Sequence, residues 1–396
     1  MKSDNGKDLD DQIQVPEELT SDNKLSGIEA ESPDNTEEGI HEPFDPDKID
    51  VKTRTITLDL VMKRVEENEI DLMPDFQRRA GIWDLRRKTQ LIESLLLRIP
   101  LPVFYVAAKE DESWSVVDGL QRLATLKEFI LDQSFNLVGL EFLSVFLGKN
   151  YNQLSRQMQR RILETEVTIH VIQPGTPVTV MFNIFKRINT GGMPLSPQEI
   201  RHALLQGRAT RLLKDLAEST IFREATRNKI RDERMADREC ILRFAAFHLN
   251  VPAKYSESDL DSLLVNSMKL INGWTDIEEE KLRESFAHAM GAAIRILGLY
   301  AFRKYYGKDY RLSPINKALF EVWSVEFAKL DKDQIDSISA KKSVLLEKFA
   351  ALMQRDYDFV AAISVGTGDS SKVRRRFSQI EKLIQETLDA EDPQAT

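Results

Sequence analysis

The segment WSVVDGLQRLATLKEFI (Trp114–Ile130) decides the fold prediction for the first half of the chain. It opens with a short apolar run typical of a buried strand, and this run leads directly into Asp118 and Gly119. The residues that follow have the apolar spacing of a helix, so we predict a strand that passes straight into a helix. Gln121 and Arg122 lie in the first turn of that helix, next to the acid, and the role of this polar group is the first question that the sequence raises.

Strands and helices alternate on both sides of this segment. We predict strands at TRTITLD, VFYVAA and VTIHVIQ, with helices at residues 58–69, 84–99 and 181–188 between and after them. This alternation predicts a mixed α/β domain of the α+β class over residues 51–206. From residue 207 onward the strand pattern fades and amphipathic segments follow, which predicts an all-helical domain over residues 207–396.

The acidity of the chain is concentrated at its N-terminus. The formal net charge is −9, but residues 1–50 hold 16 acids and 4 bases, while the remaining residues hold 48 acids and 51 bases. Because residues 1–50 are polar and poor in aromatic side chains, we predict that this acidic tail is disordered. The folded part is close to neutral, without the strongly basic footprint that would by itself indicate nucleic-acid binding.

Several classes of protein and site are excluded by residue counts and spacing. The one cysteine, Cys240, excludes a disulfide framework, and its apolar surroundings favour a core position over a nucleophile. The five histidines lie far apart, so a zinc site is not expected, and the common phosphate-loop and dinucleotide motifs are missing. Without a signal-peptide pattern or a run of about 18 apolar residues, we expect a cytoplasmic protein with no membrane contact.

The residues at the strand-to-helix junction allow two interpretations. Asp118 with Gln121 matches a capping box, which would need no function. Arg122 fits that account poorly, because a cation in the first turn opposes the helix dipole and favours a nearby anion. A turn of this kind commonly binds phosphate through its backbone N–H groups. Asp118 would repel phosphate unless a divalent cation bridged the two, so a polyphosphate site here implies Mg²⁺.

A second candidate cluster is MPDFQRRAGIW (residues 73–83), which contains Gln77 and Arg78. It is either a polar surface loop anchored by its tryptophan or a segment whose guanidinium groups bind phosphate. A third is FKRINTGGMPLSPQEIRHAL (residues 185–204), which contains Arg187 and Asn189.

Much of this third cluster is helix punctuation. The glycine pair suits the end of one helix, and Ser196 with Glu199 predicts a capping box that starts the next helix. Arg187, which precedes the glycine-rich turn, could also reach an anion.

A short basic run, SKVRRRF, lies near the C-terminus. Such a run is usually a solvated face, but it could equally contact a nucleic-acid backbone. The candidate DNA contacts are Lys372, Arg374, Arg375 and Arg376.

Three segments together resemble the N-terminal domain of GmrSD-type restriction enzymes, a large prokaryotic family. They are PDFQRRAGIW, then LIESLLLRIPLPVFYV leading to VVDGLQRLATL, then FKRINTGGMPLSPQEIRHALLQG. The stretches ERMADRECILRFAAF and FVAAISVGTGDSSKVRRRF resemble stand-alone members, so the resemblance covers about residues 52–385. It implies a ParB/sulfiredoxin-like fold for residues 51–206.

The resemblance also implies a pocket for a nucleoside triphosphate (NTP) with Mg²⁺ at the Asp-Gly-x-Gln-Arg motif, and nucleotide hydrolysis in anti-phage, restriction-type defence. In this sequence the motif is Asp118, Gly119, Gln121 and Arg122, and the pocket walls are Gln77, Arg78, Arg187 and Asn189. Asp118 would hold the metal or orient the attacking water, and Gln121 is a second residue that could position water. Arg122 and Arg78 would neutralise phosphate charge. We therefore predict that Asp118 and Gln121 cap the helix and that the same turn also binds a metal–triphosphate.

Two departures from the family pattern bear on function. Leu120 replaces the glutamine common at the third motif position, and no His-Asn-His nuclease signature follows in the second half. DNA cleavage would therefore need a separate nuclease or other effector protein as a partner, with DNA as a further candidate partner. The alternative is a non-catalytic DNA-binding or scaffold protein in which nucleotide is only a conformational ligand. A DNA nickase is a third interpretation, for which the sequence has no metal-carboxylate signature.

Overall fold

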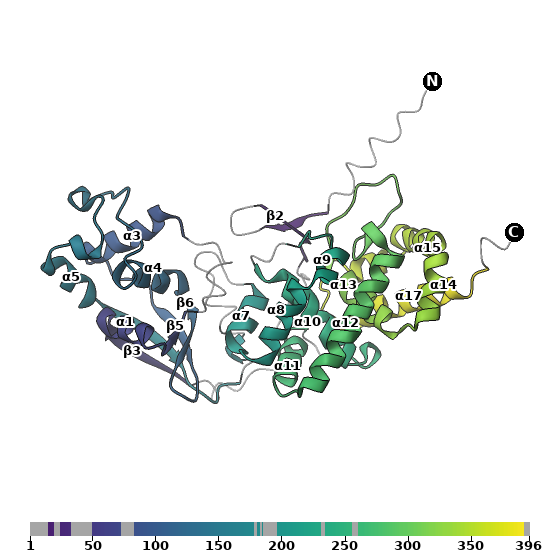
Figure 1. Cartoon of the computed structure of the whole chain (residues 1–396), viewed down its shortest axis with the longest axis horizontal. Coiled ribbons are helices and arrows are strands. Elements are labelled where there is room, and N and C mark those ends of the chain that lie inside the picture. The colour runs from purple at the N-terminus through teal and green to yellow at the C-terminus, as the bar shows by residue number, and fades with distance from the viewer. Residues whose placement is uncertain are drawn as a thin grey trace, which may run out of the picture. The chain divides into compact units, whose positions relative to one another are not determined.

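The computed structural model describes residues 15–19, 24–32, 50–72, 83–177, 180–182, 184, 196–230, 234–255 and 260–391. The chain divides into two compact units (Figure 1). One, which we call the sheet unit, is Glu42–Leu204, and the other, which we call the helical unit, combines Met1–His41 with Leu205–Thr396. Within the described residues, no helix is both long enough and apolar enough to cross a membrane.

A mixed five-stranded sheet organises the sheet unit, with the strand order β3-β7-β5-β6-β4. The strands are β3 (Val51–Thr57), β4 (Ile70–Asp71), β5 (Phe104–Ala108), β6 (Trp114–Asp118) and β7 (Glu166–Ile172). The pairs β3–β7 and β5–β6 are antiparallel, whereas β5–β7 and β4–β6 are parallel. This sheet, combined with helices, confirms the predicted α+β class.

The strands of the sheet are buried to different degrees beneath the helices of the sheet unit. Residues 114–117 of β6 are all buried, and β7 alternates between buried and more exposed positions over most of its length. Helices cover the sheet and pack on one another, with α1 contacting α4 and α5, and α3 contacting α4 and α5. Their bounds are α1 (Leu58–Glu66), α3 (Leu85–Leu96), α4 (Leu120–Ile130), α5 (Arg156–Leu163) and α7 (Pro197–Leu204).

The helical unit is built around two helices that are buried on nearly every face, α10 (Ala236–Leu249) and α13 (Lys317–Lys329). Helix α10 contacts α8, α11 and α13, and α13 also contacts α12 and α17. The surrounding helices are α8 (Arg208–Glu218), α9 (Thr220–Ala225), α11 (Leu260–Asn272), α12 (Asp276–Ile296), α14 (Lys332–Ala340), α15 (Lys342–Arg355), α16 (Tyr357–Ala362) and α17 (Ser370–Leu388). The prediction of a helical second half is confirmed. Cys240 is fully buried in α10, and burial raises the pKa of its thiol, as expected for a core cysteine.

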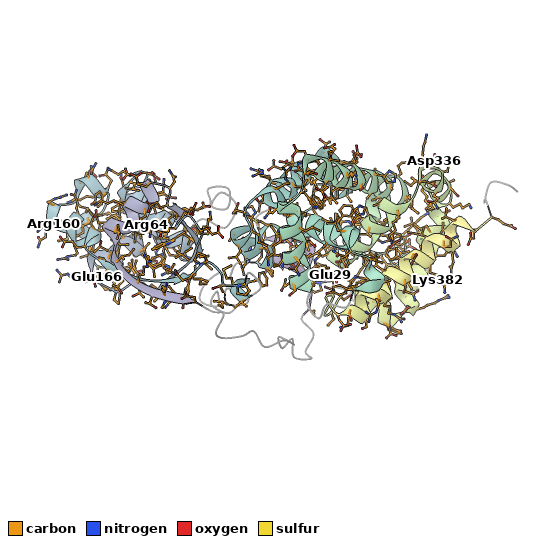
Figure 2. The ribbon with its side chains drawn as sticks, turned by 90° about the horizontal axis from the view of Figure 1, so that it is seen from below. Glu29, Arg64, Arg160, Glu166, Asp336 and Lys382 are labelled. Carbon is orange, nitrogen blue, oxygen red and sulfur yellow. The ribbon has the colours of Figure 1, made fainter. Side chains whose placement is uncertain are left out.

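The prediction of a disordered acidic tail is wrong for the described part of residues 1–50. Strands β1 (Glu17–Leu19) and β2 (Leu25–Glu29) form an antiparallel pair within the helical unit. Ile28 is 0% exposed and bridges to Ile315. Figure 2 shows Glu29 among the helices of this unit. The prediction rested on the composition of residues 1–50 as a whole. Within them, Glu18, Glu29 and Glu31 pair with buried cations of the helices, and these ion pairs stabilise the N-terminal segment in the fold.

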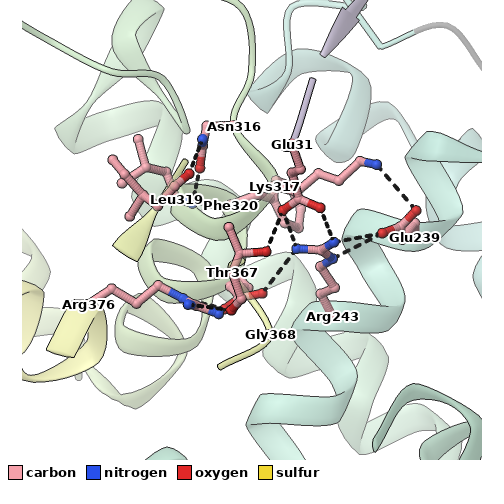
Figure 3. A network of polar contacts seen from close by, with 12 residues as sticks. Glu31, Glu239, Arg243, Asn316, Lys317, Leu319, Phe320, Thr367, Gly368 and Arg376 are labelled. Atoms are coloured by element: carbon pink, nitrogen blue, oxygen red, sulfur yellow. Dashed lines mark hydrogen bonds and ion pairs between the residues drawn. The ribbon is translucent and has the colours of Figure 1, made fainter. Parts of the chain in front are cut away.

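Glu31 belongs to a network of polar contacts with Arg243, Glu239 and Lys317, shown in Figure 3. Glu31 accepts two hydrogen bonds from Arg243, at 2.8 and 2.6 Å, and Arg243 also pairs with Glu239 at 2.8 Å. Lys317 connects Glu239, at 3.3 Å, to Glu18 of the N-terminal segment, at 2.7 Å. Burial is the largest single effect and acts to raise the pKa of Glu31, but Arg243 and Lys317 together outweigh it and hold that pKa below its ordinary value. The N-terminal acids therefore compensate cations that the helices bury.

We predict that Glu31→Gln lowers the free energy of unfolding by about 2–3 kcal/mol, because it leaves the buried guanidinium of Arg243 without its bidentate partner. Urea denaturation of the full chain measures this change. The matched control is Glu280→Gln, since Glu280 is an exposed acid of α12 and its neutralisation should change stability by less than about 0.5 kcal/mol. Equal stabilities for Glu31→Gln and the wild type would contradict the structural role of the N-terminal segment.

Candidate functional site

The candidate site lies where β6 ends and α4 begins. Asp118 is the last residue of β6, and Gly119 is the N-cap of α4, with a left-handed φ of 97°. No side chain caps this helix. The predicted capping box of Asp118 and Gln121 is therefore wrong, because the left-handed glycine occupies the cap position and the carboxylate of Asp118 turns to Arg122 instead.

Gly119 is required at this turn for two reasons. A positive φ of this size is strained for residues with a side chain. A Cβ atom at this position would also lie 2.3 Å from Cδ1 of Phe104 and 3.1 Å from an amino group of Arg122. The glycine thus lets the backbone pass directly over the ring and the guanidinium.

Arg122 is a buried clamp between α4 and the chain that enters β5. Its guanidinium donates to the backbone carbonyls of Pro102 and Val103, the latter at 3.0 Å, and to Oδ2 of Asp118 at 3.0 Å. It also lies 4.4 Å from the centre of the Phe104 ring, within the range of a cation–π contact. Burial lowers the pKa of Arg122, and the charge of Asp118 acts in the opposite direction. Arg122 does have the nearby anion that the sequence suggested, and that anion is Asp118; direct contact with phosphate stays a prediction.

Asp118 is held by Arg122 but keeps access to solvent. One third (33%) of its side chain is exposed, and only Oδ2 accepts a hydrogen bond among the described residues. It pairs with Tyr105 across the sheet, next to an irregularity in the register of β5 and β6, and such bulges often redirect a side chain at a site. No group of three His, Cys, Asp or Glu within the described residues could bind a metal. A Mg²⁺ ion at Asp118 would therefore complete its coordination with phosphate oxygens and water, as Mg²⁺ commonly does.

Gln121 connects the second candidate cluster to the same turn. Its Oε1 accepts the backbone N–H of Trp83 at 3.4 Å, a long hydrogen bond. Trp83 is the last residue of the cluster at residues 73–83, so the end of that cluster lies against the first turn of α4. Gln77 and Arg78 lie outside the described residues.

The third candidate cluster also leads to β6. Its predicted capping box is confirmed, since the N–H of Glu199 donates to Oγ of Ser196 at 3.2 Å and the N–H of Ser196 donates to the carboxylate of Glu199. Helix α7, which this box begins, packs against β6. Arg187 and Asn189 lie outside the described residues.

Sequence reasoning missed the polar side chains that α7 buries. Gln198, Glu199, Arg201 and His202 are all buried, and Nε of Arg201 donates to Oε1 of Gln198 at 2.9 Å. The guanidinium of Arg201 also lies 5.5 Å from the ring centre of Phe182. No local signal indicated this burial, since Ile200, Ala203 and Leu204 already form an apolar face at helical spacing.

The C-terminal basic run is not the free cationic surface that we considered. Arg376 is 0% exposed and pairs with Glu321, which is also 0% exposed. It donates further to the carbonyl of Thr367 at 2.7 Å. The prediction that Arg376 contacts DNA is therefore wrong. The local sequence shows the charge of Arg376, but its buried partner Glu321 is distant in the sequence.

The other three cations of the run also make internal contacts. Arg375 donates to Asp356 at 2.7 Å, Arg374 donates to the backbone carbonyl of Tyr255 at 2.8 Å, and Lys372 donates to a backbone carbonyl at 3.0 Å. A DNA contact by these three residues stays a prediction.

The clamp generates a prediction for Arg122→Ala. Removal of the guanidinium deletes hydrogen bonds to two carbonyls and one carboxylate and opens space over Phe104, so we expect a loss of about 2–4 kcal/mol of stability. Thermal and urea denaturation measure it, with Arg86→Ala as the control, because the side chain of Arg86 is 70% exposed. A fully stable Arg122→Ala protein would show that the clamp does not hold the turn.

A comparison with known proteins found one family match. Residues 60–206 match the family described as the N-terminal domain of GmrSD restriction endonuclease. No curated protein and no solved structure matches the chain. The matched residues run from α1 through the Asp118–Arg122 turn to the end of α7, and so include all three candidate clusters. Residues 60–206 are therefore similar to the N-terminal domain of GmrSD restriction endonuclease.

Proposed function

We propose that the sheet unit binds a nucleoside triphosphate with Mg²⁺ at the turn between β6 and α4 and hydrolyses it. The observation that carries this proposal is that distant segments of the sequence meet around this turn. Asp118 ends β6, Gln121 contacts the end of the second cluster, and α7 at the end of the third cluster packs against β6. Two segments that are distant in sequence thus contact the strand and the helix that meet at this turn, and the turn lies within the residues that match the family.

The start of α4 supports phosphate binding. In the same unit, side chains cap α1, α3 and α5, whereas Gly119 provides no side-chain acceptor to the first turn of α4. The first N–H groups of an uncapped helix attract anions, and phosphate is a common ligand there. The partly exposed carboxylate of Asp118 beside these donors suits a metal ion that bridges it to the phosphates.

Each residue of the motif then has a separate part. Asp118 binds the metal or orients the attacking water, and Arg122 fixes the position of that carboxylate. Gln121 is a second residue that could position water, and it contacts Trp83, the last residue of the second cluster. Arg78 supplies phosphate-neutralising charge, which is the main form of catalysis in phosphoryl transfer. In restriction-type defence, this turnover would control a separate nuclease or other effector protein.

We predict that the wild-type chain releases phosphate from at least one of the four NTPs only when Mg²⁺ is present. Asp118→Asn should reduce this turnover by about 10²-fold or more, the scale for the loss of a catalytic group. Its stability should stay within about 1 kcal/mol, because an amide oxygen can still accept from Arg122 and the pair is partly exposed. Asp132→Asn is the matched control, since Asp132 is an exposed acid that pairs with Lys127 after α4.

Two results would contradict parts of the proposal. If Asp118→Asn turns over NTP at the wild-type rate, the carboxylate serves only as the partner of Arg122. If the wild type binds NTP without any turnover, with or without DNA, the scaffold alternative replaces the hydrolase.

A further inference from the structure

The described residues at the N-terminus, 15–19 and 24–32, pack on the rest of the helical unit in the manner of a bound peptide; we call them the N-terminal strap. The N–H of Ile315 donates to the carbonyl of Gly27 at 2.9 Å, and the N–H of Glu29 donates to the carbonyl of Ile315 at 2.8 Å. Further along, the N–H of Ser32 donates to the carbonyl of Ser364 at 3.2 Å. Main-chain pairing of this kind is how extended peptides add to the backbone of a partner.

Three acids of the strap each meet a buried cation of the helical unit. Glu18 pairs with Lys317 at 2.7 Å, Glu29 pairs with Lys304 at 2.6 Å, and Glu31 pairs with Arg243 at 2.6 Å. Among the described residues, Glu29 is the one carboxylate that forms an ion pair with Lys304. The three cations are at most 7% exposed, so their charges depend on anions supplied at this surface.

Two neutral side chains also donate hydrogen bonds to the carboxylates of Glu29 and Glu31. Nδ2 of Asn316 donates to Glu29 at 3.0 Å, and Oγ1 of Thr367 donates to Glu31 at 2.8 Å. Each of these acids therefore accepts from a cation and from a neutral donor, a combination that fixes geometry as well as charge.

The fit is also steric. Gly27 has a left-handed φ of 82°, and a Cβ atom there would lie 2.0 Å from the carbonyl oxygen of Lys229. The strap can therefore approach this close only with glycine at that position.

We propose that this surface, defined by Arg243, Lys304, Lys317 and the backbone of Ile315 and Ser364, is a binding site for an extended acidic peptide. Its ligand is the strap of the same chain, which binds as a tethered and exchangeable segment. Most contacts that define the site are directional and polar. Among the described residues of the strap, only Ile28 belongs to the buried apolar core, and the rest of the core of this unit comes from residues 205–391. A tether gives the strap a high effective concentration, so the site is occupied in the intact chain.

The test uses the full chain with the recognition sequence of a site-specific protease inserted after Gly39. After cleavage under native conditions, we expect the N-terminal fragment to co-elute with the remainder in gel filtration. An excess of a fluorescent synthetic peptide of residues 15–32 should then replace it, as measured by fluorescence anisotropy.

Variant peptides separate sequence-specific binding from general attraction. Glu31→Gln and Gly27→Ala should each weaken binding by about 10-fold or more, since one loses a charge-assisted bidentate contact and the other cannot approach Lys229. Leu25→Ala is the control and should bind like the wild-type peptide, because Leu25 is 56% exposed.

The proposal is overturned if the fragment leaves on cleavage and the peptide does not bind, since the surface is then no peptide site. It is also overturned if the fragment stays but excess peptide never replaces it, because the strap is then a permanent part of the fold. Equal binding of the Glu31→Gln and wild-type peptides would remove the assigned recognition of acid by Arg243.

Discussion

The burial of one guanidinium organises the candidate site. Arg122 cannot stay buried without acceptors, and it finds them in two backbone carbonyls ahead of β5 and in Asp118 at the end of β6. These contacts place α4 on the sheet, require glycine at the intervening position and fix the direction of the carboxylate. The sequence assigned Arg122 to phosphate binding, but in the structure Arg122 binds the backbone and the carboxylate of Asp118. It thereby fixes the position of that carboxylate at the turn.

The helical unit also buries cations, and it has more of them to pair. It buries Arg243, Lys304, Lys317 and Arg376, and buried charges are tolerated only when they are paired and hydrogen-bonded. Glu239 and Glu321 come from its own helices, whereas Glu29 and Glu31 come from the N-terminal strap. In both units, charges that look like surface features in the sequence become internal structural contacts.

This difference explains which sequence predictions succeeded. The apolar periodicity of the strand at Trp114–Asp118 and of the later helices is a local property, and it led to the α+β class and the helical second half. The capping box of Ser196 and Glu199 is equally local and was predicted from four consecutive residues. The cap assigned to Asp118, the surface position of Arg376 and the disorder of the N-terminus were wrong. Each of those depended on a partner that is distant in sequence or on a left-handed glycine that local patterns did not indicate. The site is thus predictable as a motif, but the separate parts of Asp118 and Arg122 follow only from the packed structure.

The central claim is that the turn around Asp118 holds a metal–triphosphate, and a crystal structure of the chain with Mg²⁺ and a non-hydrolysable NTP tests it most directly. We predict that the phosphates lie against the first backbone N–H groups of α4 and that Mg²⁺ lies about 2.0–2.1 Å from an oxygen of Asp118. Arg122 should keep its contacts with Pro102 and Val103 in that complex. A nucleotide bound elsewhere on the chain, or a metal that does not contact Asp118, would contradict the account.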